Sequence, residues 1–257
     1  VPTALHWDTL DPYHYVRIQP LSPEAGLTEP SGSEGQDVLI VGGEDHKTGQ
    51  AEVQADPYAR LESWTRLRFP MIREVKYRWS GQVLETIDGL AFIGRNPLDA
   101  PNVFIVTGDS GMGMTHGTIA GILLTDLILG RENPWAKLYD PSRKTLQALG
   151  RFLNENLNVA VQYGDWLTGG DVDSPAQIKP GAGAVIRRGL TKMAMYRDEQ
   201  GALHEHSAVC PHLGGIVHWN DAEKTWDCPC HGSRFDRRGG VLNQPENRDS
   251  SGGKKTP

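Results

Sequence analysis

The chain has 257 residues, with 38% hydrophobic residues, 23% charged residues, 3 cysteines and a formal net charge of -6. This composition predicts a folded chain of one large or two ordinary domains, and the acidic balance argues against a nucleic-acid partner. No apolar run comes near the roughly 18 residues of a transmembrane helix. The opening residues have neither the basic start nor the apolar core of a signal peptide. The few, clustered cysteines exclude a disulfide framework and favour a reducing, cytoplasmic location.

The first part of the chain combines a polar segment, a strand and a helix. Residues 20–36 are rich in Pro, Gly, Ser and Glu and predict a mobile loop. The stretch "DVLIVGGEDH" that follows predicts a buried strand running into a glycine turn. A helix is then expected from an N-cap at Asp56 to Pro70. Its apolar face would carry Leu61, Trp64 and Leu67.

Further strands and two helices are expected up to about residue 166. The stretches "EVKYRWSGQVLET", "AFIGRN" and "NVFIVTG" each predict a strand. The strongly apolar stretch "THGTIAGILLTDLILG" predicts a helix that ends at Gly130. The stretch "SRKTLQALGRFLNENLNVAVQYGDWL" predicts a second helix, with Ser142 as its cap.

After residue 166 the sequence changes in character. Turn residues become frequent, and short strand-like pieces follow: "GAVIRR", "TKMAMYRD", "ALHEHSAV", "TWDC" and "GGVL". Short strands with many turn signals predict a small all-β domain, which Trp219 and Trp226 would help to pack. We therefore place a domain boundary near Trp166, which gives domains 1–165 and 166–257.

All three cysteines lie within one stretch, "CPHLGGIVHWNDAEKTWDCPCHGSRF". Its pattern is Cys210-x-His212 followed later by Cys228-x-x-His231. Two cysteines and two histidines can bind zinc or an iron–sulfur cluster. Each half-site here mixes one cysteine with one histidine, which favours a cluster with two inequivalent irons, one held by two thiolates and the other by two imidazoles.

The two loops resemble the cluster-binding loops of the Rieske 2Fe-2S domain. The resemblance rests on "CPHLGG" and "CPCHGSRFD" and extends over about residues 170–245. It implies a 2Fe-2S cluster with Cys210, His212, Cys228 and His231 as its ligands. A zinc site or an empty site is the alternative. His204, His206 and His218 are not at ligand spacing and are expected to be surface or loop residues.

The resemblance also has departures. Respiratory Rieske proteins carry one further cysteine in each loop, and these two form a disulfide; here Cys230 holds one place and Gly215 the other. Cys230 is therefore expected to be a free, buried thiol. Ser233 matches a serine that donates a hydrogen bond to a bridging sulfide, whereas Phe235 replaces a tyrosine that donates to a ligand sulfur. One donor fewer predicts a reduction potential below that of the respiratory class.

The preceding part of the chain resembles a different family. The stretches "RWSGQVLETIDGLAFIGRNP" and "NVFIVTGDSGMGMTHGTIAGILLTDLILG" are similar to the C-terminal half of flavoproteins of the D-amino-acid oxidase and glycine oxidase type. In that family a glycine-rich loop feeds the last long helix and lies against the flavin of FAD. The resemblance implies cofactor contacts by Gly108, Gly111, Met112, Gly113, Thr115, His116, Gly117 and Thr118. A tight turn before a buried helix, without a ligand, would fit the same residues.

One element of that family is missing. No G-x-G-x-x-G follows a strand here, although this motif holds the FAD pyrophosphate. We therefore expect the chain to be the C-terminal part of a longer protein: an α+β fold in which a partial flavoprotein precedes the small all-β domain. Residues that could face the substrate are Tyr13, Tyr15, Arg17, His46 and Trp79. Packing or solvent exposure accounts for each of them equally well, and the catalytic residues stay unknown.

Together the two resemblances imply an FAD-dependent oxidoreductase with an amine or amino-acid-type substrate. Its Rieske cluster would pass electrons between the flavin and a partner, either an electron donor or acceptor protein or a quinone-like acceptor. One alternative is a Rieske ferredoxin-like electron carrier without its own flavin catalysis; another is a zinc-stabilised interaction module. A ring-hydroxylating oxygenase would need a second iron site from two His and a carboxylate, and no such spacing follows His231. The substrate, the direction of electron flow and the oligomeric state stay open.

Overall fold

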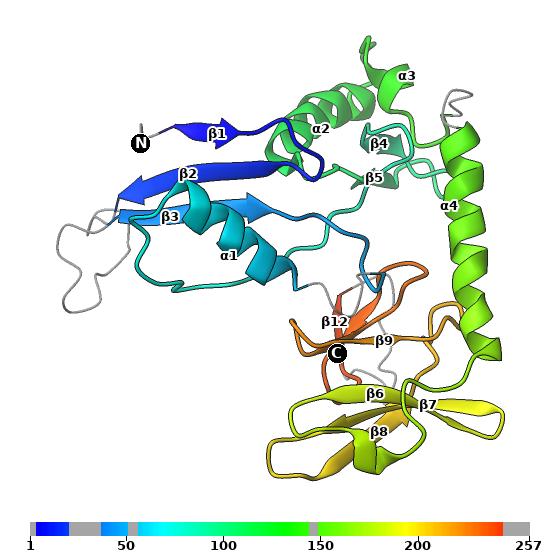
Figure 1. Ribbon diagram of the computed structural model, residues 1–257. Coiled ribbons are helices and arrows are strands. Elements are labelled where there is room, and N and C mark those ends of the chain that lie inside the picture. Colours follow the sequence, from blue (N-terminus) through cyan, green and yellow to red (C-terminus); the bar gives the residue numbers. More distant parts are fainter. Residues whose placement is uncertain (1–3, 21–36, 51–55, 144–148, 244–257) are drawn as a thin grey trace. The chain divides into compact units, whose positions relative to one another are not determined.

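The computed structural model describes residues 4–20, 37–50, 56–143 and 149–243 (Figure 1). The chain divides into two compact units. The first unit combines Val1–Trp79 with Asp165–Pro257, and the second is Ser80–Gly164. Helices and sheets are both present in the described residues, which confirms the predicted α+β class. The predicted mobile loop at 20–36 lies almost wholly outside the described residues.

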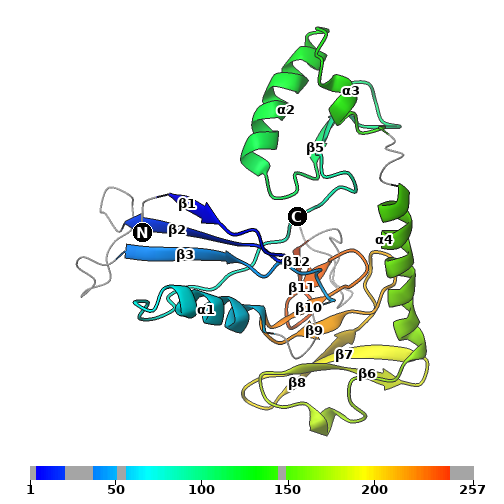
Figure 2. The same ribbon diagram turned by 45° about the horizontal axis from the view of Figure 1, so that its top comes forward.

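A three-stranded antiparallel sheet opens the first unit. It consists of β1 (Leu5–Trp7), β2 (His14–Pro20) and β3 (Asp37–Gly43), in the order β1-β2-β3. Strand β3 confirms the strand predicted from "DVLIVGG", but it is only half-buried, and β1 and β2 were not predicted. Helix α1 (Pro57–Arg68) lies along β3 in both views of the ribbon (Figures 1 and 2).

The predicted N-cap of α1 is confirmed, but its predicted apolar face is only partly correct. The Asp56 carboxylate accepts hydrogen bonds from the backbone N–H groups of Tyr58 and Ala59. On the helix Thr65 is buried, whereas Leu67 is 80% exposed. A helix turns about 100° per residue, so repeated steps of three residues rotate away from one stripe. Leu67 therefore points about 120° away from Leu61.

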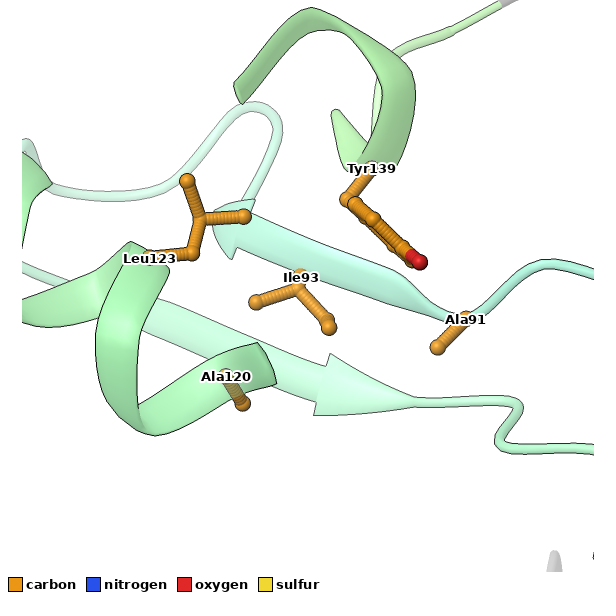
Figure 3. Packing of buried hydrophobic residues seen from close by; sticks show 5 residues of the cluster. All are labelled: Ala91, Ile93, Ala120, Leu123 and Tyr139. Atoms are coloured by element: carbon orange, nitrogen blue, oxygen red, sulfur yellow. The ribbon is translucent and has the colours of Figure 1, made fainter. Parts of the chain in front are cut away.

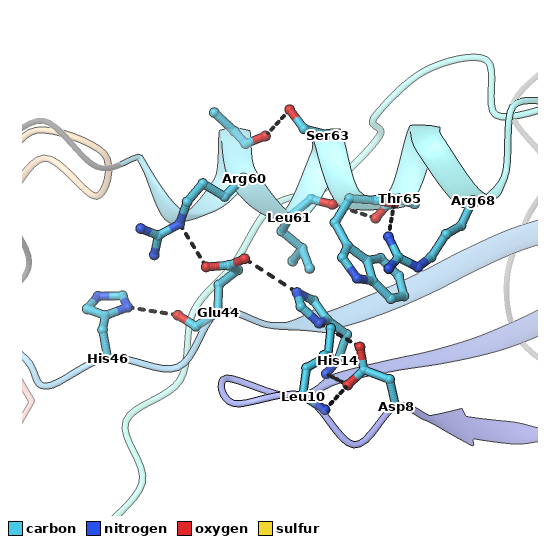
Figure 4. A network of polar contacts seen from close by, with 12 residues as sticks. Asp8, Leu10, His14, Glu44, His46, Arg60, Leu61, Ser63, Thr65 and Arg68 are labelled. Carbon is cyan, nitrogen blue, oxygen red and sulfur yellow. Dashed lines mark hydrogen bonds and ion pairs between the residues drawn. The ribbon is translucent and has the colours of Figure 1, made fainter.

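A polar network joins the sheet to α1 (Figure 4). The buried ring of His14 contacts Asp8 through Nδ1 at 3.0 Å and Glu44 through Nε2 at 3.4 Å. It also stacks on Trp64, with ring centroids 4.3 Å apart. Arg60 of α1 donates to the second Glu44 oxygen at 2.8 Å. Because both ring nitrogens of His14 have a carboxylate partner, the sheet can bury this histidine at low cost.

The second unit contains a small hydrophobic core (Figure 3). Strands β4 (Phe92–Arg95) and β5 (Phe104–Thr107) form an antiparallel pair against α2 (Gly113–Ile128) and α3 (Ala136–Tyr139). Helix α4 (Leu149–Gln162) follows. The core consists of Ala91, Ile93, Ala120, Leu123 and Tyr139. The two predicted strands and the apolar helix are thereby confirmed, and Gly130, with φ 67°, follows the Leu129 C-cap.

Two other predicted elements of this region, a strand and the start of the last helix, are not confirmed. The strand predicted from "EVKYRWSGQVLET" is wrong, because described residues 74–86 form no strand. Its apolar side chains are exposed at Val75, Tyr77, Trp79 and Val83, so the apolar pattern there is not matched by burial. The last helix was predicted to begin at a cap at Ser142. Residues 144–148 lie outside the described residues, helix α4 covers Leu149–Gln162, and the hydroxyl of Ser142 donates to Asp140.

Arg143 fastens the end of α3 to the segment that leads into β4. Its guanidinium makes a two-pronged ion pair with Asp88, at 2.7 and 2.8 Å. It also donates to the carbonyl groups of Leu90 and Ala91, at 2.5 and 2.8 Å, and stacks 4.1 Å from the ring centroid of Phe92. The Arg143 side chain, which makes all of these contacts, is only 10% exposed.

We expect Arg143→Ala to destabilise the protein by about 2 kcal/mol, because it leaves a carboxylate and two carbonyl groups with fewer donors. Urea unfolding should show this loss. The matched control is Arg131→Ala, since Arg131 is 65% exposed and meets Asp126 at 3.8 Å. Such a surface pair contributes about 0–1 kcal/mol. Equal losses in the two variants would contradict a special role for Arg143.

The C-terminal part of the first unit is built from two antiparallel sheets (Figure 2). One has β6 (Gly183–Arg188), β7 (Thr191–Arg197) and β8 (Leu203–Ser207), in the order β6-β7-β8. The other has β9 (His218–Asn220), β10 (Thr225–Asp227), β11 (Arg234–Phe235) and β12 (Val241–Asn243), in the order β12-β11-β10-β9. The short helical turns Tyr163–Leu167 and Pro175–Gln177 precede them.

Aromatic rings hold these two sheets together, as the sequence predicted. Trp226 is fully buried, and its ring centroid lies 5.0 Å from that of Trp219. Trp219 in turn stacks on Tyr196 at 5.4 Å. Gly183 on β6 makes room for this pair, since an added Cβ would lie only 2.5 Å from the Trp219 ring. The resulting small all-β body carries the cysteine and histidine cluster.

Candidate metal centre

Two loops of the same geometry carry the predicted ligands. In the first loop, Cys210–Gly215, the N–H of Cys210 donates to the carbonyl of Gly215 at 2.7 Å, and that of Gly214 to Cys210 at 2.9 Å. In the second loop, Cys228–Ser233, the corresponding bonds join Cys228 to Ser233 at 2.8 Å and Gly232 to Cys228 at 3.0 Å. Gly214 and Gly232 both have positive φ, 78° and 77°. Glycine at these places allows each loop to turn back on its cysteine.

The structure brings the four predicted ligands together as two pairs. Cys210 and Cys228 are 1% and 2% exposed, and the Cys228 thiol donates a hydrogen bond to the Cys210 sulfur. The rings of His212 and His231 lie edge to face, with centroids 4.9 Å apart. His212 is partly exposed and His231 exposed. The sulfur pair is therefore inside the domain and the imidazole pair at its surface.

Hydrogen-bond donors converge on the two sulfurs. The hydrogen bond from Cys228 lowers the pKa of Cys210 to about 6, with help from the backbone N–H of His212 and the hydroxyl of Ser233. The Cys228 pKa is raised, because this thiol is the donor of that bond and is buried, while the backbone N–H of Cys230 donates to its sulfur. Burial and the neighbouring His212 lower the pKa of His231, which favours the neutral imidazole that metals bind.

Ser233 is fully buried and its hydroxyl faces this site. It forms no hydrogen bond of ordinary geometry among the described residues. It is nevertheless close enough to the Cys210 sulfur to favour the thiolate. A buried hydroxyl without a good acceptor costs about 1–3 kcal/mol, so a further acceptor beside the cysteines would be stabilising.

The grouping of the ligands bears on the kind of metal. In the described part of the chain, no set of three or more His, Cys, Asp and Glu side chains is placed to hold one metal ion. A buried pair of sulfurs and a pair of imidazoles at the surface suit two metal ions with two protein ligands each.

Cys230 is a free and buried thiol, as predicted from the sequence. Burial raises its pKa. A Cβ added to Gly215 would lie 2.6 Å from the Cys230 sulfur and 3.2 Å from that of Cys228. Any larger residue at position 215 would crowd these two sulfurs, whereas glycine leaves room for them.

A buried ion pair closes the base of the second loop. Asp227 and Arg234 flank the loop on β10 and β11 and bond through both carboxylate oxygens, at 2.9 and 3.0 Å. Asn220 and Thr225 also donate to the Asp227 carboxylate, each at 2.9 Å. Asp227 is 1% exposed. Phe235, next to Arg234, is fully buried.

The other histidines of this part lie on strands and make separate contacts. His204 pairs with Asp198 at 2.8 Å, and His218 pairs with Asp165 at 2.8 Å. His206 is buried and its ring is perpendicular to that of Trp226, with centroids 5.5 Å apart, although the sequence suggested a surface or loop position. Its burial follows from strand alternation, because inward and outward positions alternate along β8.

In the second unit, a glycine-rich loop joins β5 to α2. Gly108, Ser110 and Gly111 have φ values of 69°, 51° and 79°, so the chain makes repeated left-handed turns there. No side chain caps the N-terminus of α2. Of the predicted cofactor contacts, Gly111, Met112, Gly113, Thr115, Gly117 and Thr118 are exposed.

The remaining two predicted contacts are buried. Gly108 lies against Thr86, where a Cβ would come within 2.4 Å of a methyl carbon. His116 points inward, with Nδ1 3.0 Å from the carbonyl oxygen of Asp109 and its ring edge-on to Tyr139. The imidazole thus supports the loop from within.

Comparison with known families assigns both parts of the chain. Residues 2–127 match the FAD dependent oxidoreductase family, and residues 170–251 match the Rieske [2Fe-2S] domain. The chain carries an FAD-dependent oxidoreductase domain followed by a Rieske [2Fe-2S] domain. Both predicted resemblances are thereby confirmed, and the two domains imply a 2Fe-2S cluster and FAD as cofactors.

Individual proteins similar to this chain are also named for Rieske or iron-sulfur proteins. The Bacillus subtilis (strain 168) relative YhfW, which carries the name of a Rieske 2Fe-2S iron-sulfur protein, is 37% identical over 216 residues. That match covers 82% of this chain and 42% of YhfW, so the chain spans less than half of this relative. The cytochrome b6-f complex iron-sulfur subunit of Synechococcus elongatus is 30% identical over 135 residues, 51% of this chain and 68% of that protein.

Among solved structures, the plasma membrane Rieske protein PetC3 from Synechocystis PCC 6803 is 28% identical. It matches with a TM-score of 0.27 over 30% of this chain and 80% of that protein. No helix in the described residues of this chain has the length and apolar character needed to cross a membrane.

The Rieske domain provides a setting that fits the cluster. The sulfur pair, the imidazole pair and the buried Ser233 hydroxyl are the groups that such a cluster engages. The two backbone N–H groups that already point at sulfur would donate to liganded thiolates without rearrangement.

The suggested substrate-side residues take varied positions. Tyr13 and Tyr15 have rings 6.4 Å apart, with Tyr15 on β2. Arg17 on β2 donates to Gln19, and His46 contacts the carbonyl oxygen of Glu44. Trp79 is 65% exposed. A role in substrate binding stays a prediction for each of them.

Proposed function

We propose that this redox protein passes electrons between FAD and a 2Fe-2S cluster whose irons are bound by Cys210 with Cys228 and by His212 with His231. The observation that carries the proposal is the separation of these residues into a buried sulfur pair and an exposed imidazole pair. When bound, such a cluster takes up or releases one electron at a time, whereas a flavin exchanges two with its substrate.

The protein groups around the cluster would set its reduction potential. The N–H groups of His212 and Cys230 and the Ser233 hydroxyl place positive dipole ends at the sulfurs. Such donors stabilise added negative charge and raise the potential. His212 and His231 would provide the exposed edge at which electrons enter or leave.

The glycine-rich loop and the start of α2 are proposed as the flavin contacts. Residues Gly108, Gly111, Met112, Gly113, Thr115, His116, Gly117 and Thr118 would form this site. The positive φ values let the backbone approach a planar ring closely, and the uncapped N-terminus of α2 favours negative charge near it. His116 would contribute through its backbone, since its ring supports Asp109.

Several finer features belong to the same proposal. The substrate would be an amine or amino acid, and the partner an electron donor or acceptor protein or a quinone-like acceptor. The flavoprotein part would extend over residues 1–165 and the Rieske part over 166–257. Three buried free cysteines favour a reducing compartment such as the cytoplasm.

Chemical analysis of the purified protein tests the cluster. We expect equal amounts of iron and acid-labile sulfide, about two of each per chain, and the EPR signal of a reduced Rieske centre. Cys228→Ala should abolish both, whereas Cys230→Ser, two residues away, should retain them. Zinc without sulfide would refute the proposal in favour of a zinc-stabilised module.

Titration with FAD tests the flavoprotein part. Stoichiometric binding, followed by flavin absorbance, is the expected result. If the chain holds a cluster but binds no FAD at any concentration tested, the electron-carrier alternative is the better description. Gly113→Val should be compared in parallel and should bind FAD more weakly, because it places a branched side chain on the proposed flavin loop and displaces the Asp109 carboxylate, which lies 2.8 Å from an added Cβ.

A further inference from the structure

A turn after β3 packs against the second cluster-binding loop. The N–H of Gln50 donates to the carbonyl of Lys47 at 3.1 Å, which closes the turn, and Gly49 has a φ of 73°. A positive φ at the third position of a turn is the place of glycine in type II turns. The backbone conformation of the turn is therefore by itself a reason for glycine at position 49.

The second reason for glycine is contact with the loop itself. A Cβ added to Gly49 would lie 2.8 Å from the nitrogen of Pro229 and 2.9 Å from the carbonyl carbon of Cys228. These distances are shorter than any real Cβ contact, and the atoms concerned are backbone that cannot swing aside. The turn thus touches the peptide that follows a proposed cluster ligand.

Gln50 completes this contact with a directed hydrogen bond. Its Nε2 donates to the carbonyl oxygen of Pro229 at 2.8 Å, across 179 residues of sequence. The same peptide group carries the N–H of Cys230, which donates to the sulfur of Cys228. One peptide therefore lies between two hydrogen bonds, with Gln50 at one end and the ligand sulfur at the other.

Hydrogen bonds in such a chain reinforce one another. A donor on the carbonyl oxygen polarises the peptide and makes its N–H a stronger donor, by about 10–30% per bond. A stronger N–H donor stabilises the negative charge that the sulfur carries in a reduced cluster. A Gln50 amide bound to Pro229 should therefore favour reduction.

We propose that Gln50, which lies in the FAD-dependent oxidoreductase part, is a positioning residue that raises the reduction potential of the Rieske cluster through the Pro229–Cys230 peptide. This inference rests on the proposed ligation by Cys228. It links the two domains, because the flavoprotein part supplies a group on which the cluster's affinity for an electron depends.

A second contact provides a control. The hydroxyl of Tyr58 on α1 donates to the carboxylate of Glu223, again between the flavoprotein part and the Rieske part. Glu223 belongs to the turn between β9 and β10, not to a cluster-binding loop. Tyr58→Phe therefore weakens the contact between the flavoprotein part and the Rieske part. It leaves intact the two hydrogen bonds that link Gln50 through the Pro229–Cys230 peptide to the Cys228 sulfur.

The test is a redox titration of the cluster, monitored by EPR, in the full chain and three variants. Gln50→Leu removes the donor and keeps the size of the side chain. Gln200→Leu makes the same exchange at an exposed position in the Rieske part. We expect Gln50→Leu to lower the midpoint potential, so that the ratio of reduced to oxidised cluster falls several-fold at a fixed solution potential. Gln200→Leu and Tyr58→Phe should leave it unchanged.

The possible outcomes separate this inference from the proposed function. An absence of iron and sulfide in every variant, the unaltered chain included, would refute the ligation itself. A normal cluster with an unchanged potential in Gln50→Leu would refute only the role of Gln50. Equal shifts in Gln50→Leu and Tyr58→Phe would also overturn it, since docking in general would then set the potential.

Discussion

Replacing Asp227 by alanine should destabilise the Rieske domain by about 3–5 kcal/mol and release its cluster, because the change removes the carboxylate that forms a two-pronged ion pair with the buried Arg234. Asp227 is 1% exposed and Arg234 8% exposed, so water cannot replace the missing carboxylate. Asn220 and Thr225 would each lose an acceptor as well. Urea unfolding followed by fluorescence, with visible absorbance for the cluster, measures the two effects.

The loss of the cluster follows from the position of the pair. Asp227 immediately precedes Cys228, and Arg234 immediately follows Ser233, so the ion pair fixes both ends of the second loop. A loop whose ends separate cannot hold the Cys228 sulfur beside that of Cys210. We therefore expect the visible spectrum to disappear at lower urea concentrations than the loss of secondary structure.

Asp221→Ala is the matched control in the same domain. Its carboxylate is 66% exposed and pairs with Lys224 at 2.8 Å, which predicts a loss of about 0–1 kcal/mol. The double change Asp227→Leu with Arg234→Met should recover much of the stability lost by Asp227→Ala, since apolar pairs often replace buried ion pairs at little cost. A double variant as unstable as the single one would show that the loss of the ion pair is not the cause.

The parts of the site that were predictable depend on residues close in sequence. Cys210 with His212, and Cys228 with His231, are separated by one or two residues, so their spacing alone indicates a shared role. The free state of Cys230 follows from glycine at position 215. The N-cap at Asp56 and the end of α2 near Gly130 were equally readable, because capping depends on neighbouring residues.

Contacts between distant residues left no comparable signal. His14 meets Glu44 across 30 residues, and Gln50 meets Pro229 across 179. Nothing in the local pattern around His14 or Gln50 indicates such a partner. The strand predicted in residues 74–86 failed for a related reason, since a β-strand is stabilised by a partner strand that local sequence cannot supply. Tertiary pairing decides these positions.

Introducing a cysteine at position 215 should create a disulfide with Cys230 and stabilise the Rieske domain by up to about 3 kcal/mol, the value for a loop of about 15 residues. A Cβ at Gly215 would lie 3.5 Å from the Cβ of Cys230, at the lower edge of the range found across disulfides. Gly215 has an ordinary φ, so its backbone accepts a side chain. Formation requires oxidising conditions during purification.

Thiol counting and thermal unfolding test this expectation. After unfolding and removal of the cluster, reactive thiols should fall from the three free cysteines of the unaltered chain to two in Gly215→Cys. The gain in melting temperature should vanish when a reductant is added.

Two variants separate the bond from the added side chain. Gly215→Ala places a Cβ 2.6 Å from the Cys230 sulfur without forming a bond, so it should be less stable than the unaltered chain. Gly214→Cys adds a thiol whose Cβ has nothing within 4 Å, so it should keep all its thiols free, although the φ of 78° at this position strains the loop and should lower its stability. If Gly215→Cys also kept four reactive thiols under oxidising conditions, the two loops would not approach as the structure places them. If it lost two thiols but gained no stability, crowding of the Cys228 sulfur, 3.2 Å from the new Cβ, would offset the cross-link.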